Sequence, residues 1–330
     1  MKTKVLTFCC VVVLAPFFSV SSKGQEAFLN LGSTKDDETS EKSFFWSIEY
    51  MQDLSEHCAF SFSWLNEGHL ENHNIHHRDG QSMQIWAKED IIDKKFSLLA
   101  GIGPYLYSDT TGVVQDRNYR DNHGLGIEYS LAGIWHLKNP WIVKAQGNYI
   151  DTFDNFDTIS FSLGLGYMLG SSFPENDSDS KKSYQEENTT GKEVSVFLGP
   201  VIVNSFDSEK NMAKSIEYRQ GLSKYIDWSV AWIDEGDADL INRRGGATQL
   251  WLTRSFLEES LTWGFGGGPY IFEDKEKDSA GSEIGIAGLV SVSGSYRLSE
   301  KWLTRVSWSR VVSDYDRDTD IILFGFGYRF

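Results

Sequence analysis

The sequence predicts an all-β protein whose strands form antiparallel transmembrane β-barrels, and three observations predict it. Short segments alternate apolar with small or polar residues, one sequence unit occurs twice, and the last segment ends on an aromatic residue. Period-two alternation indicates strands with one apolar face. In lipid such strands must close into a barrel, because only helices and closed sheets satisfy every backbone polar group there.

The last segment, Asp320 to Phe330, shows the alternation most clearly. Its aromatic residues share one face: Phe324, Phe326, Tyr328 and Phe330. The other face is small or polar, with Gly325, Gly327 and Arg329. Such a strand resembles the closing strand of a bacterial outer-membrane β-barrel. The resemblance implies that Phe330 belongs to the signal for barrel assembly. A soluble two-domain sandwich, the alternative, would instead bury the apolar faces against each other.

Residues 1–22 are expected to be a secretory signal peptide. Lys2 and Lys4 precede an apolar run that is too short to span a membrane and that ends in small residues. We therefore expect export through the secretory pathway and residence in the outer membrane. After removal of the peptide the chain holds a single cysteine, Cys58, which excludes an internal disulfide.

Composition and charge limit the classes of partner. The chain has 40% apolar and 14% aromatic residues, 30 glycines and six prolines, which suits many strands joined by polar turns. Its formal net charge of −16 argues against nucleic acid or anionic lipid as a direct partner. The expected partners are outer-membrane lipids and lipopolysaccharide, contacted through divalent cations, and the barrel assembly machinery. No cofactor is expected, since the sequence has no phosphate loop, CxxC pair or metalloprotease motif.

The chain is a tandem repeat. Ser47–Gly68 and Ser215–Gly236 are identical at 11 of 22 positions without a gap. Gly103-Pro104-Tyr105 recurs as Gly268-Pro269-Tyr270. We therefore expect a first eight-stranded repeat at 25–169, a flexible polar linker at 170–192 and a second eight-stranded repeat at 193–330.

Each repeat contains eight period-two segments. In the first repeat they lie near 26–33, 44–53, 57–67, 81–90, 95–107, 124–137, 141–150 and 158–169. In the second they lie near 193–205, 214–222, 225–235, 246–255, 260–272, 283–297, 301–312 and 319–330. Short turns alternate with long polar stretches, which we expect to form extracellular loops at 68–80, 108–123, 237–245 and 273–282.

Sixteen strands allow two closures. Two barrels of eight strands have interiors just filled by side chains, whereas one sixteen-stranded barrel has a water-filled lumen. We favour two barrels, because a hairpin within one barrel would not need the polar linker. Each half should then fold alone, and cleavage within Asn176–Glu187 should release separable fragments.

The short turns, the Gly-rich central strand and the Gly-x-Gly-Tyr closing strand of each repeat resemble the eight-stranded lipid A 3-O-deacylase family. That family carries a His-x-Ser pair on its penultimate strand, assisted by an acidic residue. The equivalent segments here begin at Trp141 and Trp302 and contain no histidine. Ser307 and Ser309 lack a base on their own strand, so the resemblance supports the fold and argues against the activity.

Charged residues flank one loop in each repeat, an acid where one strand ends and a base where the next begins. The candidates for a polar ligand site at this extracellular rim are Glu67, Arg78, Asp79, Glu235, Arg243 and Arg244. The alternative interpretation is a salt-bridged loop mouth with a structural role only. Glu49 and Glu217, in mid-strand, are expected to pair with Lys or Arg inside the barrel, because a buried carboxylate needs a partner.

The first of these loops also carries four histidines: His69, His73, His76 and His77. Such a run can bind zinc, copper or nickel. The second repeat has no histidine there, and the spacing matches no closed site. We therefore favour a polar rim over a metal site.

Three functions remain open. The favoured one is a non-catalytic outer-membrane barrel with a structural role or with binding of an envelope ligand at its extracellular loops. A passive diffusion channel would require the sixteen-stranded closure. A lipid A-modifying, deacylase-like hydrolase of divergent mechanism is the enzymatic alternative.

Overall fold

The computed structural model describes residues 24–72, 74–92, 95–113, 118–137, 140–170, 190–205, 207–238, 240–257, 259–275 and 283–330. The expected signal peptide and most of the expected linker, residues 171–189, lie outside the described residues. Among the described residues, no helix is long and apolar enough to cross a membrane.

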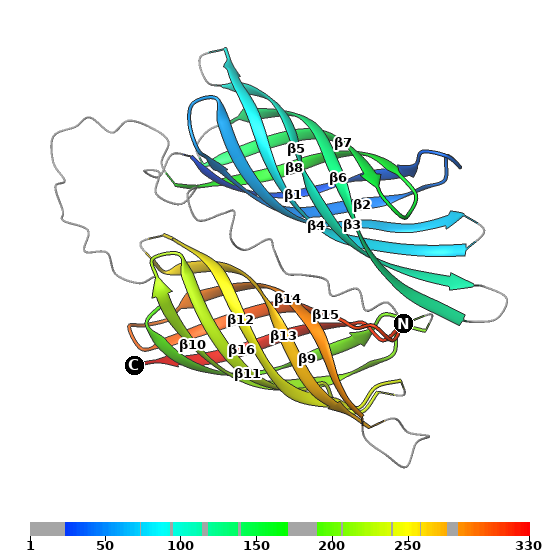
Figure 1. Ribbon diagram of the computed structural model, residues 1–330. Coiled ribbons are helices and arrows are strands. Elements are labelled where there is room, and N and C mark those ends of the chain that lie inside the picture. The colour runs from blue at the N-terminus through cyan, green and yellow to red at the C-terminus, as the bar shows by residue number, and fades with distance from the viewer. Residues whose placement is uncertain are drawn as a thin grey trace.

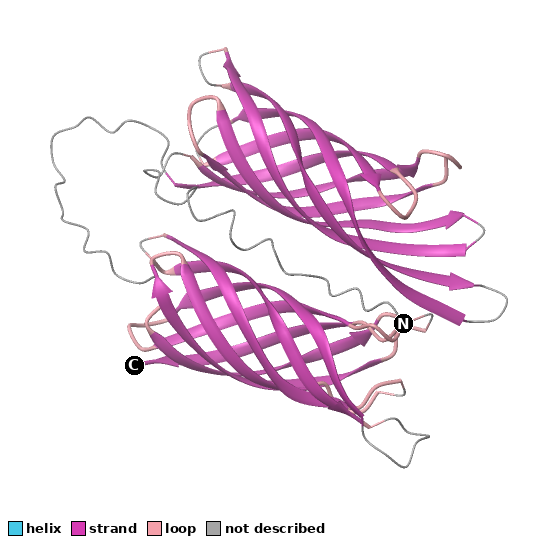
Figure 2. Cartoon of the chain, in the orientation of Figure 1, coloured by secondary structure: helices cyan, strands magenta, loops and turns pink. Residues whose placement is uncertain are grey.

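The described chain is all-β and antiparallel, with two closed barrels of eight strands each (Figures 1 and 2). The first barrel consists of β1 (Gln25–Asp36), β2 (Lys42–Asp53), β3 (Cys58–Asn72), β4 (Asn74–Ile91), β5 (Phe96–Val113), β6 (Asn118–His136), β7 (Trp141–Thr152) and β8 (Thr158–Gly170). The second consists of β9 (Lys192–Val203), β10 (Lys210–Ser223), β11 (Ile226–Asp234), β12 (Arg243–Phe256), β13 (Leu261–Asp274), β14 (Glu283–Arg297), β15 (Trp302–Val312) and β16 (Thr319–Arg329). The predicted fold class is confirmed.

Each barrel closes on its own first and last strands. Strand β1 pairs with β8, so that Leu31 lies opposite Leu163. Strand β9 pairs with β16, so that Val196 lies opposite Phe326. The alternative of one sixteen-stranded barrel is therefore wrong. A ring of eight strands leaves no unpaired edge, so neither half needs strands of the other.

Two of the long loops expected from the sequence are strands instead. Hairpin β3–β4 continues to Asn72 and Asn74, and hairpin β5–β6 continues to Val113 and Asn118. Backbone hydrogen bonds can continue a hairpin after the apolar alternation has ended. The side chains of these extensions are polar, so the sequence pattern did not predict them as strands. In the second barrel the stretch between β11 and β12 is a loop, as expected.

The two ends of each barrel differ. One end, which we call the turn end, carries the chain ends of each barrel and short turns such as those after β2 and β4. The other end, which we call the loop end, carries the extended hairpins and the β7–β8 and β15–β16 connections. In outer-membrane barrels short turns lie on the periplasmic side and longer loops outside.

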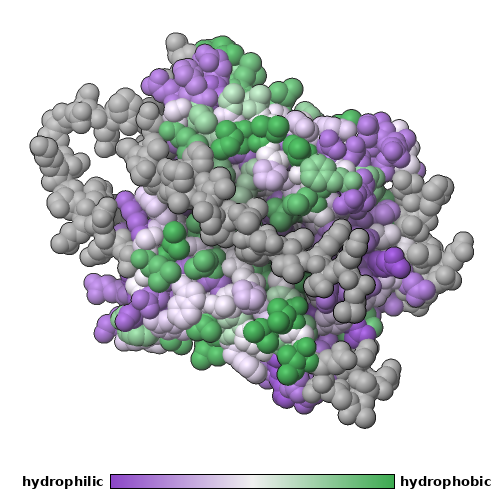
Figure 3. Space-filling view, in the orientation of Figure 1, coloured by the Kyte–Doolittle hydropathy of each residue, from purple (hydrophilic) through white to green (hydrophobic). Residues whose placement is uncertain are grey.

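Apolar side chains face outward in a belt around both barrels. The exposed fraction is 70% for Leu131, 59% for Phe161 and 63% for Phe326. In Figure 3 hydrophobic residues lie along the flank of the upper barrel, and hydrophilic residues gather toward its two ends. Such a belt costs free energy in water and none in hydrocarbon.

Buried polar and aromatic side chains fill both lumens at mid-height. Lys144 Nζ lies 2.6 Å from Glu49 Oε2 and 4.8 Å from the centre of the Trp86 ring. In the second barrel Arg305 pairs with Glu217 at 2.8 Å. These are the pairs expected for the two mid-strand glutamates. Side chains, rather than a continuous water column, occupy the barrels at this height.

The two barrels lie side by side (Figure 1), and side chains of both meet along a line that we call the seam. Its ring contacts, from the loop end to the turn end, include Trp64 with Trp308 (centres 4.3 Å apart), Phe62 with Phe265 (4.2 Å) and Tyr50 with Phe256 (6.1 Å). Because loop end meets loop end and turn end meets turn end, the two apolar belts lie at one level.

Phe330, the expected assembly signal, follows β16 at the turn end. Its N–H donates to the carbonyl oxygen of Lys192 at 3.0 Å, and its side chain is exposed. The terminal aromatic is therefore accessible, and its role in assembly stays a prediction.

Candidate functional site

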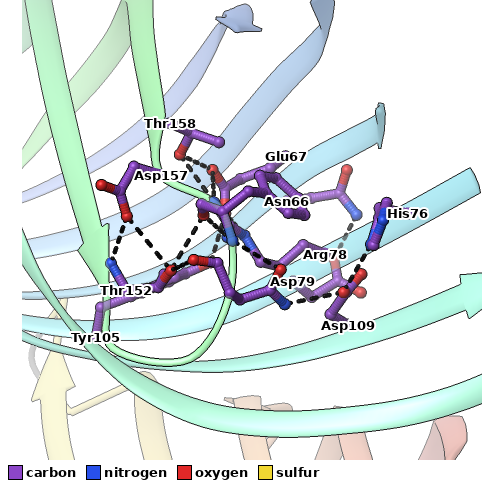
Figure 4. A network of polar contacts seen from close by, with 12 residues as sticks. Asn66, Glu67, His76, Arg78, Asp79, Tyr105, Asp109, Thr152, Asp157 and Thr158 are labelled. Carbon is purple, nitrogen blue, oxygen red and sulfur yellow. Dashed lines mark hydrogen bonds and ion pairs between the residues drawn. The ribbon is translucent and has the colours of Figure 1, made fainter. Parts of the chain in front are cut away.

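A buried network closes the loop end of the first barrel (Figure 4). Arg78 donates to both carboxylate oxygens of Glu67, at 2.5 and 3.0 Å, and to Thr158 Oγ1 at 2.9 Å. Its other terminal nitrogen donates to the carbonyl oxygen of Phe156 at 2.6 Å. The Tyr105 hydroxyl donates to Glu67 at 2.8 Å. Bidentate, charge-assisted bonds of this kind are among the strongest in proteins, and here both charged groups are fully buried.

Strand geometry explains why these side chains meet. Glu67 stands two residues beyond the buried Leu65, on the inward face of β3, and Arg78 lies on the inward face of the paired strand β4. The pairing then bulges at Gly68, where φ is 66°. A Cβ there would lie 2.6 Å from the carbonyl oxygen of Phe44, so the position requires glycine.

The second barrel carries a similar network, in which the arginine binds the glutamate through one nitrogen rather than two. Arg243 donates to Glu235 and to Thr319, each at 2.8 Å, and to the carbonyl oxygen of Arg317 at 2.9 Å. It also donates to the Tyr315 hydroxyl at 3.2 Å. Burial raises the pKa of the Tyr315 phenol to about 12. Both barrels thus have an ion pair sealed inside the loop end.

The remaining two charged candidates point out of the barrels. Asp79 is buried in the seam, where Arg310 donates to it at 2.8 Å while also binding Asp320 at 2.5 Å. Arg244 is exposed and pairs with Glu273 at 3.2 Å. The six candidates therefore do not form one site. Four are inside the lumens, one is in the seam and one is on the surface.

A polar cleft opens at the loop end of the first barrel, and we call it the rim cleft. It has a volume of about 840 Å³ and lies between the extended hairpins and the β7–β8 loop. Its lining includes Tyr107, Tyr119, Arg120, Asn122, Asp154 and Asn155, with Asp316 from the second barrel. Its volume falls within the range of small-molecule sites, and its lining is polar, which suits a polar ligand.

A histidine–carboxylate pair forms one wall of the rim cleft. His76 Nδ1 lies 2.9 Å from Asp109 Oδ2. The same oxygen accepts hydrogen bonds from Asn155 at 2.9 Å and from Thr111 at 3.1 Å. The buried carboxylate thus fixes the orientation of the imidazole, whose other nitrogen lies on the opposite side of the ring.

The histidine run does not form a metal site in the part of the chain that the structure describes. The His69 and His77 rings stack with their centres 4.6 Å apart, and His76 is held by Asp109. No three His, Cys, Asp or Glu side chains among the described residues are arranged as metal ligands. His73 lies outside the described residues.

Sequence reasoning missed several members of the two networks and of the rim cleft: Tyr105, Thr158, Thr319 and Asp109. A signal for Tyr105 was present, because its Gly-Pro-Tyr motif recurs at the equivalent place in the second repeat. The contacts of Asp109 had no such signal, since they join β4, β5 and the β7–β8 loop, which are far apart in the sequence.

No protein-family model matches the chain, and no curated protein matches it. The N-terminal β-barrel domain of OprF from Pseudomonas aeruginosa is similar at 8% identity and a TM-score of 0.35, covering 45% of this chain and 99% of that one. Ail of Yersinia pestis, in complex with the heparin analogue sucrose octasulfate, is similar at 13% identity and a TM-score of 0.35, covering 44% and 99%. The CymD monoaromatic hydrocarbon channel covers 94% of this chain and 89% of its own, at 10% identity and a TM-score of 0.26. Because these values are low, we base the functional proposal on the geometry of the chain itself.

Proposed function

We propose that the protein is a bacterial outer-membrane protein that spans the membrane with both barrels and binds a polar envelope ligand in the rim cleft, without catalysing a reaction. The observation that carries the proposal is a polar cleft of about 840 Å³ at the loop end of a barrel whose own lumen is filled.

The outward faces support a membrane location. Exposed apolar residues form a belt around each barrel, and the polar loop ends and turn ends lie beyond it. Closed barrels satisfy all strand edges, which lipid requires. The seam holds the two belts at one level, so a single bilayer can surround both barrels.

The filled lumens support binding rather than diffusion. In the first barrel, a solute would have to displace the Glu67–Arg78 pair and then the Glu49–Lys144 pair, all of whose side chains are fully buried. Separating a buried pair from its partners costs several kcal/mol. A passive channel, which needed the sixteen-stranded closure, is therefore not our proposal.

The rim cleft suits the core saccharide of lipopolysaccharide, which lies on the outer surface. The amides of Asn122 and Asn155 and the guanidinium of Arg120 can bond to hydroxyl and phosphate groups. Asp154 and Asp316 line the same space and can share a divalent cation with phosphates of the ligand.

The binding proposal is tested by calorimetry with purified protein and the deacylated core oligosaccharide of lipopolysaccharide, with magnesium and with a chelator. We expect binding that Arg120→Gln weakens about tenfold, the loss expected for one charge-assisted hydrogen bond. Chelation should weaken binding further if a cation bridges the carboxylates and the phosphates.

The matched control is Arg244→Gln, at the loop end of the second barrel and outside the rim cleft. It should leave the affinity unchanged. Absence of binding in both buffers, or equal weakening by both variants, would reject the cleft as the ligand site. Steady conductance steps in planar bilayers would favour the channel instead.

A further inference from the structure

We propose that the lumen of the first barrel holds one monovalent metal cation, bound by Glu128 together with Ser82 and Gln84. The inference goes beyond the ligand of the rim cleft, because none of these three residues lines that cleft. It depends only on the packing inside the barrel.

Glu128 is a carboxylate of the lumen without a counter-charge of its own. It lies on the inward face of β6 and is 1% exposed. Neither of its carboxylate oxygens has a hydrogen-bond partner of normal length among the residues that the structure describes. The charged groups that act on it include Glu49 and Glu67, which have the same sign, and Lys144, which already binds Glu49 at 2.6 Å. A buried charge in a protein is paired, binds a metal or is neutralised by a proton.

Two neutral side chains beside Glu128 also present buried oxygen atoms that have no such partner in the described part of the chain: Ser82 Oγ and Gln84 Oε1. Ser82 lies close enough to act on the Glu128 carboxylate. Gln84 donates to the main-chain carbonyl of Glu128 at 3.4 Å and to Ser130 at 2.8 Å. The Ser130 hydroxyl itself donates to Asn148 at 2.8 Å, which fixes the orientation of the Gln84 amide. The amide oxygen therefore remains as an acceptor.

A metal cation fits this set of atoms better than a proton or water does. A proton on Glu128 would supply one O–H donor, and the other oxygen atoms would gain no partner. Water would donate to the oxygen atoms but would leave the charge uncompensated. One cation binds several oxygen atoms at once and also supplies the missing charge. With a single uncompensated carboxylate, a monovalent cation leaves the site neutral, whereas calcium takes about 6–8 oxygen ligands.

The second barrel shows that the fold does not require these polar groups. Gln249 donates to the main-chain carbonyl of Leu289 at 3.4 Å, as its counterpart in the first barrel does to that of Glu128. Leu289 therefore stands where the first barrel has Glu128. Ala247, two residues before the glutamine, stands where the first barrel has Ser82. Both replacements are buried and apolar, so the two barrels differ at both positions together, as one shared ligand in the first barrel explains.

The test is the stability of the full chain against urea in detergent, with choline chloride replaced stepwise by sodium or potassium chloride at constant ionic strength. A deuterium pulse followed by mass spectrometry of the peptides reports the unfolding of each barrel separately. Above the dissociation constant of the cation, each tenfold rise in its concentration should lower the unfolding constant of the first barrel about tenfold. The second barrel of the same molecule should show no such dependence.

Glu128→Leu gives the first barrel the residue of the second and should abolish the dependence in a barrel that still folds. Ser82→Ala should weaken the affinity for the cation about tenfold, as expected for the loss of one ligand. Glu89→Gln is the matched control, because it removes the same charge from an exposed position of the same barrel, and it should keep the full dependence.

The same dependence in both barrels of the natural sequence, or in neither, would overturn the inference. An undiminished dependence in Glu128→Leu would also overturn it, and so would a response to calcium alone. If the core oligosaccharide of lipopolysaccharide fails to bind, the rim cleft is rejected as a ligand site, but the cation dependence of the first barrel is still expected.

Discussion

Replacing Arg243 with alanine is expected to lower the free energy of unfolding of the second barrel by about 3–5 kcal/mol. The substitution leaves the fully buried carboxylate of Glu235 without its ionic partner and also removes donors to Thr319 and to the Arg317 carbonyl. The measurement is urea-induced unfolding in detergent, followed by tryptophan fluorescence and by gel mobility. Arg78→Ala should have an effect of similar size in the first barrel, since Arg78 makes the equivalent bonds.

The neighbouring residue supplies the control. Arg244 carries the same charge one position along β12, but it is exposed and pairs with Glu273 on the surface. Arg244→Ala should therefore change the free energy of unfolding by only about 0–1 kcal/mol. Replacing both buried partners, as Glu235→Gln with Arg243→Met, should recover much of the loss. Equal effects of Arg243→Ala and Arg244→Ala would contradict a sealed ion pair.

The second large effect concerns the seam. The sequence alone predicts that the two halves separate once the linker is cut. The contacts across the seam lead us to expect instead that the halves stay together. Residues 24–170 and 190–330, produced as two chains in the same cell, should each fold and should copurify in mild detergent. Trp308 lies between Trp46 and Trp64, with ring centres 5.8 and 4.3 Å away, and donates to Asp320 at 2.9 Å.

Trp308→Ala should therefore weaken the association of the halves by about 30-fold or more, as expected for an aromatic residue at the centre of an interface. Trp302→Ala is the matched control, because Trp302 lies on the same strand with an exposed outward ring. It should leave copurification intact. Halves that separate without any substitution would show that the seam does not hold the barrels together.

The alternation of apolar and small residues predicted all sixteen strands, because an apolar outer surface and a packed lumen impose it directly. The repeat also identified the two charged pairs at the loop ends, which are Glu67 with Arg78 and Glu235 with Arg243. Both repeats keep the pair because the buried carboxylate in each barrel needs a positively charged partner. The hairpin extensions to Asn72 and Val113 were missed. Beyond the apolar belt nothing forces the side chains to alternate, and only backbone pairing defines the strand.

Contacts between the barrels left no signal in the sequence. Asp79 was assigned to the rim as a ligand-binding candidate, yet it binds Arg310 of the other barrel. His123 likewise lies 2.6 Å from Asp318 of the other barrel. Such pairs join residues almost two hundred positions apart or more, and no local pattern encodes them. Within the first barrel, Asn155 and Asp109 also come together in the rim cleft only through the fold, with no local pattern that joins them.

Cysteine cross-linking in the membrane tests most directly whether each repeat closes on itself. In a Cys58→Ser background, Leu31→Cys with Leu163→Cys places two outward-facing thiols on directly opposite positions of β1 and β8. Leu163→Cys with Val196→Cys places them on β8 and β9, which belong to different barrels. After mild oxidation, mass spectrometry of the peptides should find a disulfide in the first pair and none in the second. A disulfide in the second pair without one in the first would mean that the sixteen strands form a single ring.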